Sequence, residues 1–322
     1  MAVFTKINNK DISKIEKIFI LLKIKKYEGI KKGIENTNYI IYFKNTKCIL
    51  TIFEKRVHKK DLPFFMNLMS GLSKLKIKCP RPVKNKKGNY IFKIKNKNAC
   101  IVTFVKGKDK KELNFKDCYV VGKNIAKLHK ASKKIKLFRK NSLSIKSWPK
   151  LLNKIDDQIN KLSKNFKYSM KNDLQKIKEN WPKNLPKGVI HSDLFVDNII
   201  FYKKKFYGFI DFYFSSTDFL VYELGTCINA LCFKKKGGKF ILDKKKSSKL
   251  IRGYESIRKL TKEEKFYFNI ICRGSALRYL LTRAYDYLNT PKNAIIKIKD
   301  PREYLQKLNF HQEIKSFNEY LK

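Results

Sequence analysis

The stretch VIHSDLFVDN, residues 189–198, decides the fold class of this chain of 322 residues. An apolar run leads into three polar side chains at fixed offsets, His191, Asp193 and Asn198, and a second apolar run follows. Asp211 comes thirteen residues after Asn198, within the sequence IDF and past a polar turn at residues 203–205. The pattern predicts a loop between two short strands and a hairpin that returns a second carboxylate to that loop.

These residue types at this spacing suit phosphoryl transfer. H-x-D-L-x-x-x-N matches the catalytic loop of protein kinases, and IDF matches their metal-binding strand end. Phosphoryl transfer needs positioning and charge neutralisation, so Asp193 can accept the proton of an attacking hydroxyl. Asn198 and Asp211 offer Mg²⁺ the oxygen ligands that it prefers, with ATP supplying phosphate oxygens. His191 is interpreted as a structural support that hydrogen-bonds the loop backbone.

The order of apolar patterns predicts two lobes. In the first third we expect a helix over residues 11–25, strands over 38–43 and 47–54, a helix over 62–75, and strands over 90–95 and 99–105. Beyond residue 107 we expect helices over 118–128, 148–163, 170–181, 219–233, 245–258, 262–287 and 301–321, with strands only at 189–190, 198–202 and 207–212. The fold class is therefore α+β, in the two-lobed plan of a protein-kinase-like enzyme. Residues 1–105 form an N-terminal nucleotide-binding lobe with an antiparallel sheet, and residues 106–322 form a larger, mostly helical catalytic and substrate-binding lobe.

The N-terminal lobe departs from the protein-kinase pattern in the segment expected to bind the phosphates. It has no G-x-G-x-x-G, and the nearest segment is residues 29–39. The backbone N–H groups of this segment, together with Asn36 and Asn38, could cover phosphates.

Two strands of this lobe supply the other nucleotide-binding candidates. The strand CILT, residues 48–51, has Thr51 where a kinase has its phosphate-binding lysine, so the choice of cation stays open between Lys55 and Arg56. Residues 101–105 lie where a hinge would hydrogen-bond adenine with its backbone. The hinge candidates are Thr103, Phe104 and Val105.

Four further polar residues have plainer interpretations. Asp218 either caps a helix that begins near Phe219 or contacts a substrate ammonium group, and both interpretations stay open. His58, His129 and His311 have no partner at a recognisable spacing, which favours structural roles.

The net charge of +48 invites a nucleic-acid-binding interpretation, which the details disfavour. Of the 75 basic residues only nine are Arg, the residue that reads bases and holds phosphates in a rigid fork. The lysines are scattered, and Lys, Ile and Asn share A/T-rich codons. The charge is therefore expected to be a solvated surface without a specific nucleic-acid partner.

The cysteines and the apolar runs indicate a cytoplasmic protein. The seven cysteines are widely spaced and include no C-x-x-C pair, which fits neither a disulfide framework nor a zinc site. A reducing cytoplasm is the natural setting for such thiols. The N-terminal residues lack a signal-peptide pattern, and no apolar run reaches the length of a membrane span, so no membrane association is expected.

Segments along nearly the whole chain carry a family resemblance. They are MAVFT at residues 1–5, GIENTNY at 33–39, ILTIFEKRV at 49–57, DLPFF at 61–65, CPRPV at 79–83, GVIHSDLFVDNIIF at 188–201, GFIDFYF at 208–214, CINALCF at 227–233, RGSALRYLLTR at 273–283 and YDYLNTP at 285–291. With these segments the chain resembles the bacterial homoserine kinases built on the aminoglycoside-phosphotransferase, choline-kinase-like fold.

The resemblance implies transfer of the ATP γ-phosphate to the hydroxyl of L-homoserine, a step in threonine biosynthesis. It implies Asp193 as catalytic base and Asn198 and Asp211 as Mg²⁺ ligands. The resemblance also places Glu35, Tyr213 and Asp218 at the substrate side of the cleft, and it accepts threonine at position 51. The departures from the family pattern are Ser192, Val196 and Glu223.

Two alternatives follow from residue chemistry alone. A kinase of the same fold could act on choline, ethanolamine, methylthioribose or an aminoglycoside, because the chemistry of the motif is common to all of them. A basic RNA-binding protein on a kinase-like scaffold is the alternative from another class, and it predicts nucleic-acid affinity that falls steeply with salt.

Overall fold

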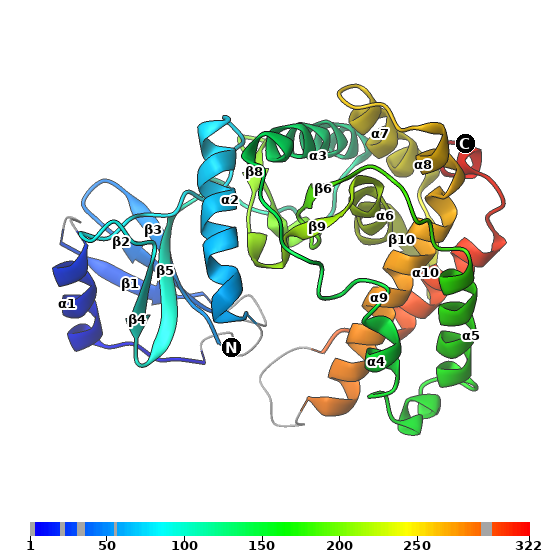
Figure 1. The fold of residues 1–322 in the computed structure, drawn as a ribbon, viewed down its shortest axis with the longest axis horizontal. Coiled ribbons are helices and arrows are strands. Elements are labelled where there is room, and N and C mark those ends of the chain that lie inside the picture. Colours follow the sequence, from blue (N-terminus) through cyan, green and yellow to red (C-terminus); the bar gives the residue numbers. More distant parts are fainter. Residues whose placement is uncertain (1–3, 20–22, 31–35, 55–56, 291–297) are drawn as a thin grey trace.

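The computed structural model describes residues 4–19, 23–30, 36–54, 57–290 and 298–322. A five-stranded antiparallel sheet forms the N-terminal part, with helices covering it, and helices dominate the rest (Figure 1). The sheet order is β1-β2-β3-β5-β4, with β1 at Lys26–Gly29, β2 at Thr37–Tyr42, β3 at Lys47–Ile52, β4 at Ile91–Ile94 and β5 at Lys97–Thr103. The predicted α+β class and the antiparallel sheet are confirmed.

The two faces of this sheet belong to different apolar cores. Along β5, Ala99 and Ile101 join the core under α1 (Asn9–Ile18), because alternate side chains of a strand point to one face. Cys100 and Val102 point the other way and join the core that includes α2 (Leu62–Lys74). That second core continues through α2 into the helical part, and Figure 1 shows α2 between the two.

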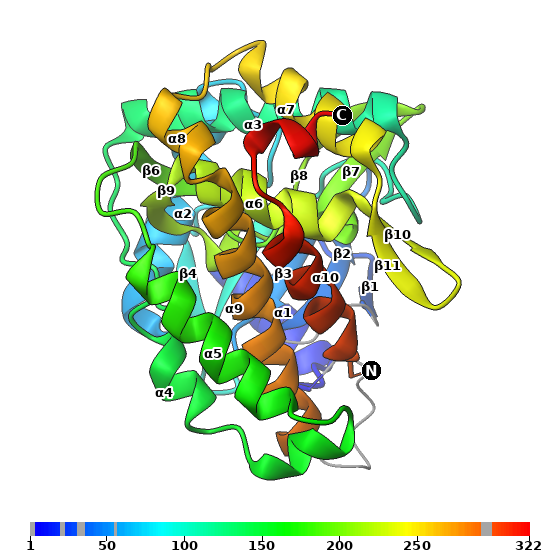
Figure 2. The same ribbon diagram turned by 90° about the vertical axis from the view of Figure 1, so that its right-hand side faces the viewer.

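The helical part is built around α9, whose turns contact α5, α6 and α10 (Figure 2). Its helices are α3 (Phe115–Ile135), α4 (Trp148–Leu152), α5 (Phe166–Glu179), α6 (Leu220–Leu231), α7 (Lys244–Glu255), α8 (Lys262–Phe266), α9 (Phe268–Asn289) and α10 (Arg302–Glu313). Antiparallel strand pairs accompany them: β6 (Lys187–Ile190) with β9 (Ser216–Phe219), β7 (Ile199–Tyr202) with β8 (Lys205–Phe209), and β10 (Phe233–Lys236) with β11 (Lys239–Leu242). Short 3₁₀ turns are η1 (Lys59–Asp61), η2 (Asp157–Lys161), η3 (Val196–Asn198), η4 (Phe212–Phe214) and η5 (Phe317–Tyr320).

Helices α3 and α7 touch backbone to backbone through two glycines. A Cβ added at Gly122 would lie 2.0 Å from the carbonyl oxygen of Leu250, and one added at Gly253 would lie 2.0 Å from that of Tyr119. Each glycine therefore leaves room for the facing helix. His129, which supports the site, also lies on α3.

Several sequence-based expectations need correction. The helix expected over 11–25 ends at Ile18, and the one over 148–163 is only the short α4 followed by η2. The helix over 262–287 is broken at Tyr267 into α8 and α9. Strands β1, β9, β10 and β11 were not anticipated, since they are four residues each and carry little periodic signal.

Among the described residues, no helix is long and apolar enough to cross a bilayer. The division of the chain at residue 105 stays a prediction, although the last strand of the sheet ends nearby at Thr103.

Candidate active site

A buried carboxylate holds the loop between β6 and η3. Glu223, on α6, accepts hydrogen bonds from the backbone N–H groups of His191 and Ser192, the latter at 3.0 Å. Ser192 has a φ of 69°, a left-handed conformation that a non-glycine residue adopts only when its surroundings hold it there. Glu223 thus fixes the bend that precedes Asp193, and Nε2 of the buried His129 ring lies 3.7 Å from the Oε2 atom of Glu223.

His191 links this loop to the strand end that carries the second carboxylate. Its Nε2 bonds the carbonyl oxygen of Ile210 at 2.8 Å, and its ring lies 4.6 Å from that of Phe212, centroid to centroid. Burial lowers the pKa of His191, so the ring stays neutral near pH 7. The side chain is enclosed away from the cavity, an arrangement that supports the predicted role as loop support.

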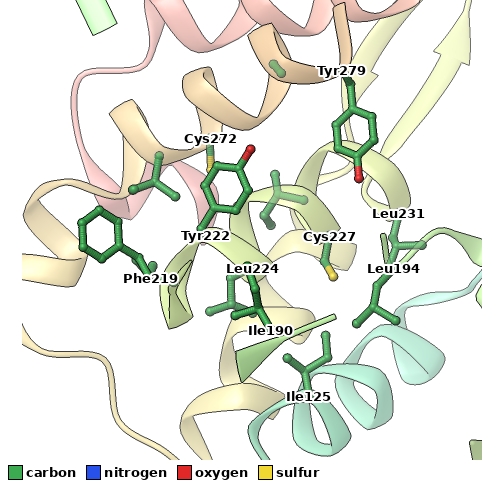
Figure 3. Packing of buried hydrophobic residues seen from close by; sticks show 14 of the residues in the cluster. Ile125, Ile190, Leu194, Phe219, Tyr222, Leu224, Cys227, Leu231, Cys272 and Tyr279 are labelled. Carbon is green, nitrogen blue, oxygen red and sulfur yellow. The ribbon is translucent and has the colours of Figure 1, made fainter. Parts of the chain in front are cut away.

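Asp193 is fixed from two sides. Asn198 Nδ2 donates to its carbonyl oxygen at 2.8 Å and approaches its Oδ2 at 3.4 Å. From α9, the Tyr279 hydroxyl bonds the Ser192 carbonyl at 3.0 Å and Asp193 Oδ1 at 3.2 Å. Figure 3 shows the Tyr279 hydroxyl directed toward the segment of Leu194, above the apolar side chains that support the loop.

The electrostatics of Asp193 suit a proton acceptor. Burial raises the pKa of its carboxyl, while the charge of Arg278 and the hydrogen bond from Tyr279 act in the opposite direction. Burial also keeps the pKa of the Tyr279 hydroxyl well above its ordinary value, so this group remains a donor. A base with a raised pKa holds an abstracted proton better than an ordinary carboxylate.

Asn198 and Asp211 together fit a divalent cation. The amide nitrogen of Asn198 is committed to Asp193, and no described residue donates to its amide oxygen. Asp211 follows β8 at a φ of 64°, and the Ile210 N–H bonds the Asn198 carbonyl at 3.0 Å, which ties the two sites together. One amide oxygen and one carboxylate suit an ion that completes its shell with water and phosphate oxygens.

All three chemical residues line one cavity of about 520 Å³ between the sheet and the helical part. The same cavity is lined by the hinge candidates Thr103, Phe104 and Val105, by Asn36, Asn38 and Thr51, and by Tyr213. The structure thus brings together most of the residues predicted from sequence.

Thr51 is part of a neutral network at the position of the kinase lysine. Its hydroxyl donates to Asn38 Oδ1 at 2.7 Å and accepts from the Tyr213 hydroxyl at 3.5 Å. The described cations that line the cavity are Lys108, Arg278, Arg283 and Lys299. Glu35, Lys55 and Arg56 lie outside the described residues.

Asp218 is not brought to the cavity. It lies in β9, where its carboxylate accepts hydrogen bonds from Asn141 at 2.7 Å and from the Phe219 N–H at 2.8 Å. It does not cap α6 either, since that helix begins at Leu220 without a side-chain cap. Among the histidines, His129 and His311 are buried in the core, as the structural interpretation requires.

Sequence reasoning missed Glu223, Arg278 and Tyr279 as parts of the site. Arg278 and Tyr279 belong to α9, a largely buried helix, and Arg278 is buried there. A charged residue on the buried face of a predicted helix was the signal that could have marked it.

Replacing Tyr279 by Phe is expected to lower kcat about tenfold, because one hydrogen bond to the base is lost while the ring remains. The lost bond lowered the pKa of Asp193, so that pKa rises further in the variant. The base must be ionised to act, and the acid limb of the kcat/KM profile therefore moves to higher pH. Rates measured from pH 5 to 9 at one metal concentration test this, and an unshifted limb would contradict the assigned bond.

The fold and this site define a phosphotransferase: a kinase-like catalytic loop, with Asn198 and Asp211 as candidate metal ligands, lines one cavity together with residues 103–105. The model of the phosphotransferase enzyme family matches residues 26–260, and the chain belongs to that family. The predicted family resemblance is confirmed.

Relatives extend over almost the whole chain. Proteins named homoserine kinase from Brucella anthropi and Agrobacterium fabrum are each 38% identical over 320 residues, covering 99% of this chain and 97% and 98% of theirs. Among solved structures, a spectinomycin phosphotransferase in complex with ADP and spectinomycin has a TM-score of 0.68 at 14% identity, with 98% of both chains covered. A choline kinase from Cryptosporidium parvum has a TM-score of 0.63 at 16% identity, covering 96% of this chain and 93% of its own. These structures confirm the protein-kinase-like fold.

Proposed function

We propose that this protein is a homoserine kinase, which transfers the γ-phosphate of ATP to the hydroxyl of L-homoserine and releases ADP and O-phospho-L-homoserine. The observation that carries the proposal is the similarity of nearly the entire chain to proteins named homoserine kinase, in a chain whose site has the residues for phosphoryl transfer. The reaction would serve threonine biosynthesis in the cytoplasm, with ATP and homoserine as the partners and no specific nucleic acid or membrane.

Each site residue has a defined task in this reaction. The hinge residues Thr103–Val105 hold the adenine, and Asn36, Asn38 and Thr51 lie on the sheet side, over the phosphates. Asp193 orients the homoserine hydroxyl and accepts its proton as the oxygen attacks the γ-phosphorus in line with the departing ADP oxygen. Asn198 and Asp211 would hold Mg²⁺, which would supply positive charge to neutralise the phosphates.

The support around these groups reduces reorganisation during the reaction. Glu223 and Tyr279 fix the loop before substrate binds, so little free energy is spent on ordering it. Tyr213 lines the same cavity, and we propose that it contacts the acceptor.

A substrate panel with a coupled ADP assay tests the proposal. We expect kcat/KM for L-homoserine to exceed that for choline, ethanolamine, methylthioribose and an aminoglycoside by about 100-fold or more, as for a site built around one acceptor. Removal of divalent cations with a chelator should abolish turnover, and added Mg²⁺ should restore it. Absence of homoserine phosphorylation, or faster turnover of another acceptor, would show that the proposal is wrong.

A further inference from the structure

Arg278 is a buried cation whose charge acts on Asp193 but which forms no ion pair with any described residue. Its side chain is 6% exposed, and no described residue accepts a hydrogen bond or forms an ion pair with its guanidinium. The other arginines enclosed in the helical part are paired: Arg258 with Glu264, Arg273 with Asp173, and Arg283 with Glu303. An unpaired buried charge is unfavourable in the free protein, so its presence points to a ligand that supplies the missing anion.

The guanidinium is held in a fixed orientation at the cavity. Its Cζ lies 3.9 Å from the ring centroid of Tyr279 and 5.9 Å from that of Phe214, and the residue lines the cavity. The Cζ atom lies over the Tyr279 ring, and no described residue accepts a hydrogen bond from the guanidinium N–H groups, which leaves them for a ligand. A guanidinium edge matches a carboxylate with two parallel hydrogen bonds.

The position of Arg278 relative to Asp193 identifies the ligand. Asp193 contacts Asn198 with one carboxylate oxygen and Tyr279 with the other. In the proposed reaction, the metal and the phosphates lie on the side of Asn198. The acceptor, whose hydroxyl contacts Asp193, therefore extends in the other direction, toward α9. On that side Arg278 is a cation of the cavity lining that no described carboxylate pairs with, and its Cζ lies over the ring of the same Tyr279.

We infer that Arg278 binds the carboxylate of an amino-acid acceptor and selects it over amino alcohols that lack this group. The inference rests on the proposed function and identifies the residue that binds the carboxylate of the substrate. The γ-phosphate of ATP is the other anion that could pair with Arg278. The experiment distinguishes this phosphate from the acceptor carboxylate.

The test compares L-homoserine with 3-amino-1-propanol, which has the same hydroxyl and amine but no carboxylate. The wild type should prefer homoserine by about 10²–10³ in kcat/KM, the range for a buried charge-assisted contact. In Arg278→Met, kcat/KM for homoserine should fall about 100-fold more than kcat/KM for 3-amino-1-propanol, which has no carboxylate for Arg278 to bind. Rates are taken on the alkaline plateau, because removal of Arg278 also raises the pKa of Asp193.

Two controls distinguish this role from a structural one. Arg278→Met should melt no lower than the wild type, because it removes an unpaired buried charge, but homoserine should no longer raise its Tm. Arg283→Met, from the same cavity wall, breaks the pair with Glu303 and should affect both acceptors alike.

The results that overturn the inference differ from those that overturn the function. Equal losses for both acceptors in Arg278→Met would assign Arg278 to ATP or to the fold. A wild-type enzyme that accepts both compounds equally would also contradict the inference while leaving phosphotransfer intact. Failure of the wild type to phosphorylate homoserine would overturn the proposed function itself.

Discussion

Asp193→Asn is expected to lower kcat by about 10³-fold or more, because the amide keeps the shape of the carboxylate and its bond to Tyr279 but cannot take a proton. The neighbouring contacts of Asn198 to the Asp193 backbone remain, so the loop and the fold should be preserved. The measurement is the steady-state rate with homoserine at saturating ATP, together with Tm and nucleotide affinity.

Asp157→Asn is the matched control for this change. Asp157 is an exposed carboxylate of η2, remote from the cavity lining, and its variant should keep wild-type kcat. A near-normal kcat in Asp193→Asn would show that another group accepts the proton. A lowered Tm with unfolded protein would instead assign Asp193 to the fold.

Gly253→Ala is expected to destabilise the protein by about 3 kcal/mol or more, the upper range for overpacking against a rigid neighbour. The added methyl would meet the Tyr119 carbonyl at 2.0 Å, so α3 and α7 must separate along their contact. Gly122→Ala, whose methyl would meet the Leu250 carbonyl, should act in the same way. The free energy of unfolding from urea titration measures the effect.

Gly71→Ala on α2 provides the comparison. Its methyl would meet only side-chain atoms of Ile135, at 2.9 Å, and these can move. The gain in helix propensity offsets part of that cost, so the change should stay within about 1 kcal/mol. A similar small effect in Gly253→Ala would mean that the helices are not in the close contact described.

The chemical centre was predictable because its residues are close in sequence. Asp193, Asn198 and Asp211 fall on one loop and one hairpin, so spacing alone placed them together. Strands β2 to β5 of the sheet were visible in local patterns, since burial alternates along β2 and β5 is a short apolar run buried on both faces.

The residues that hold Asp193 and its loop in place could not be predicted from spacing. Tyr279 reaches Asp193 across 86 residues, and Glu223 reaches His191 across 32. Such contacts depend on how α6 and α9 pack, and helical periodicity shows only which faces are buried. Asp218 illustrates the converse, because it is near the motif in sequence, but its carboxylate bonds Asn141 and the Phe219 N–H and is not among the residues that line the cavity.

The shared core along α2 has a consequence for how the two lobes behave. Phe65, Met69 and Leu72 of α2 pack in the same cluster as Cys100 of the sheet and Val121 of α3. One continuous apolar core therefore joins the two lobes. The sheet is therefore part of one cooperative folding unit with the helical lobe, and a fragment cut after residue 105 would expose the apolar side of α2 to water.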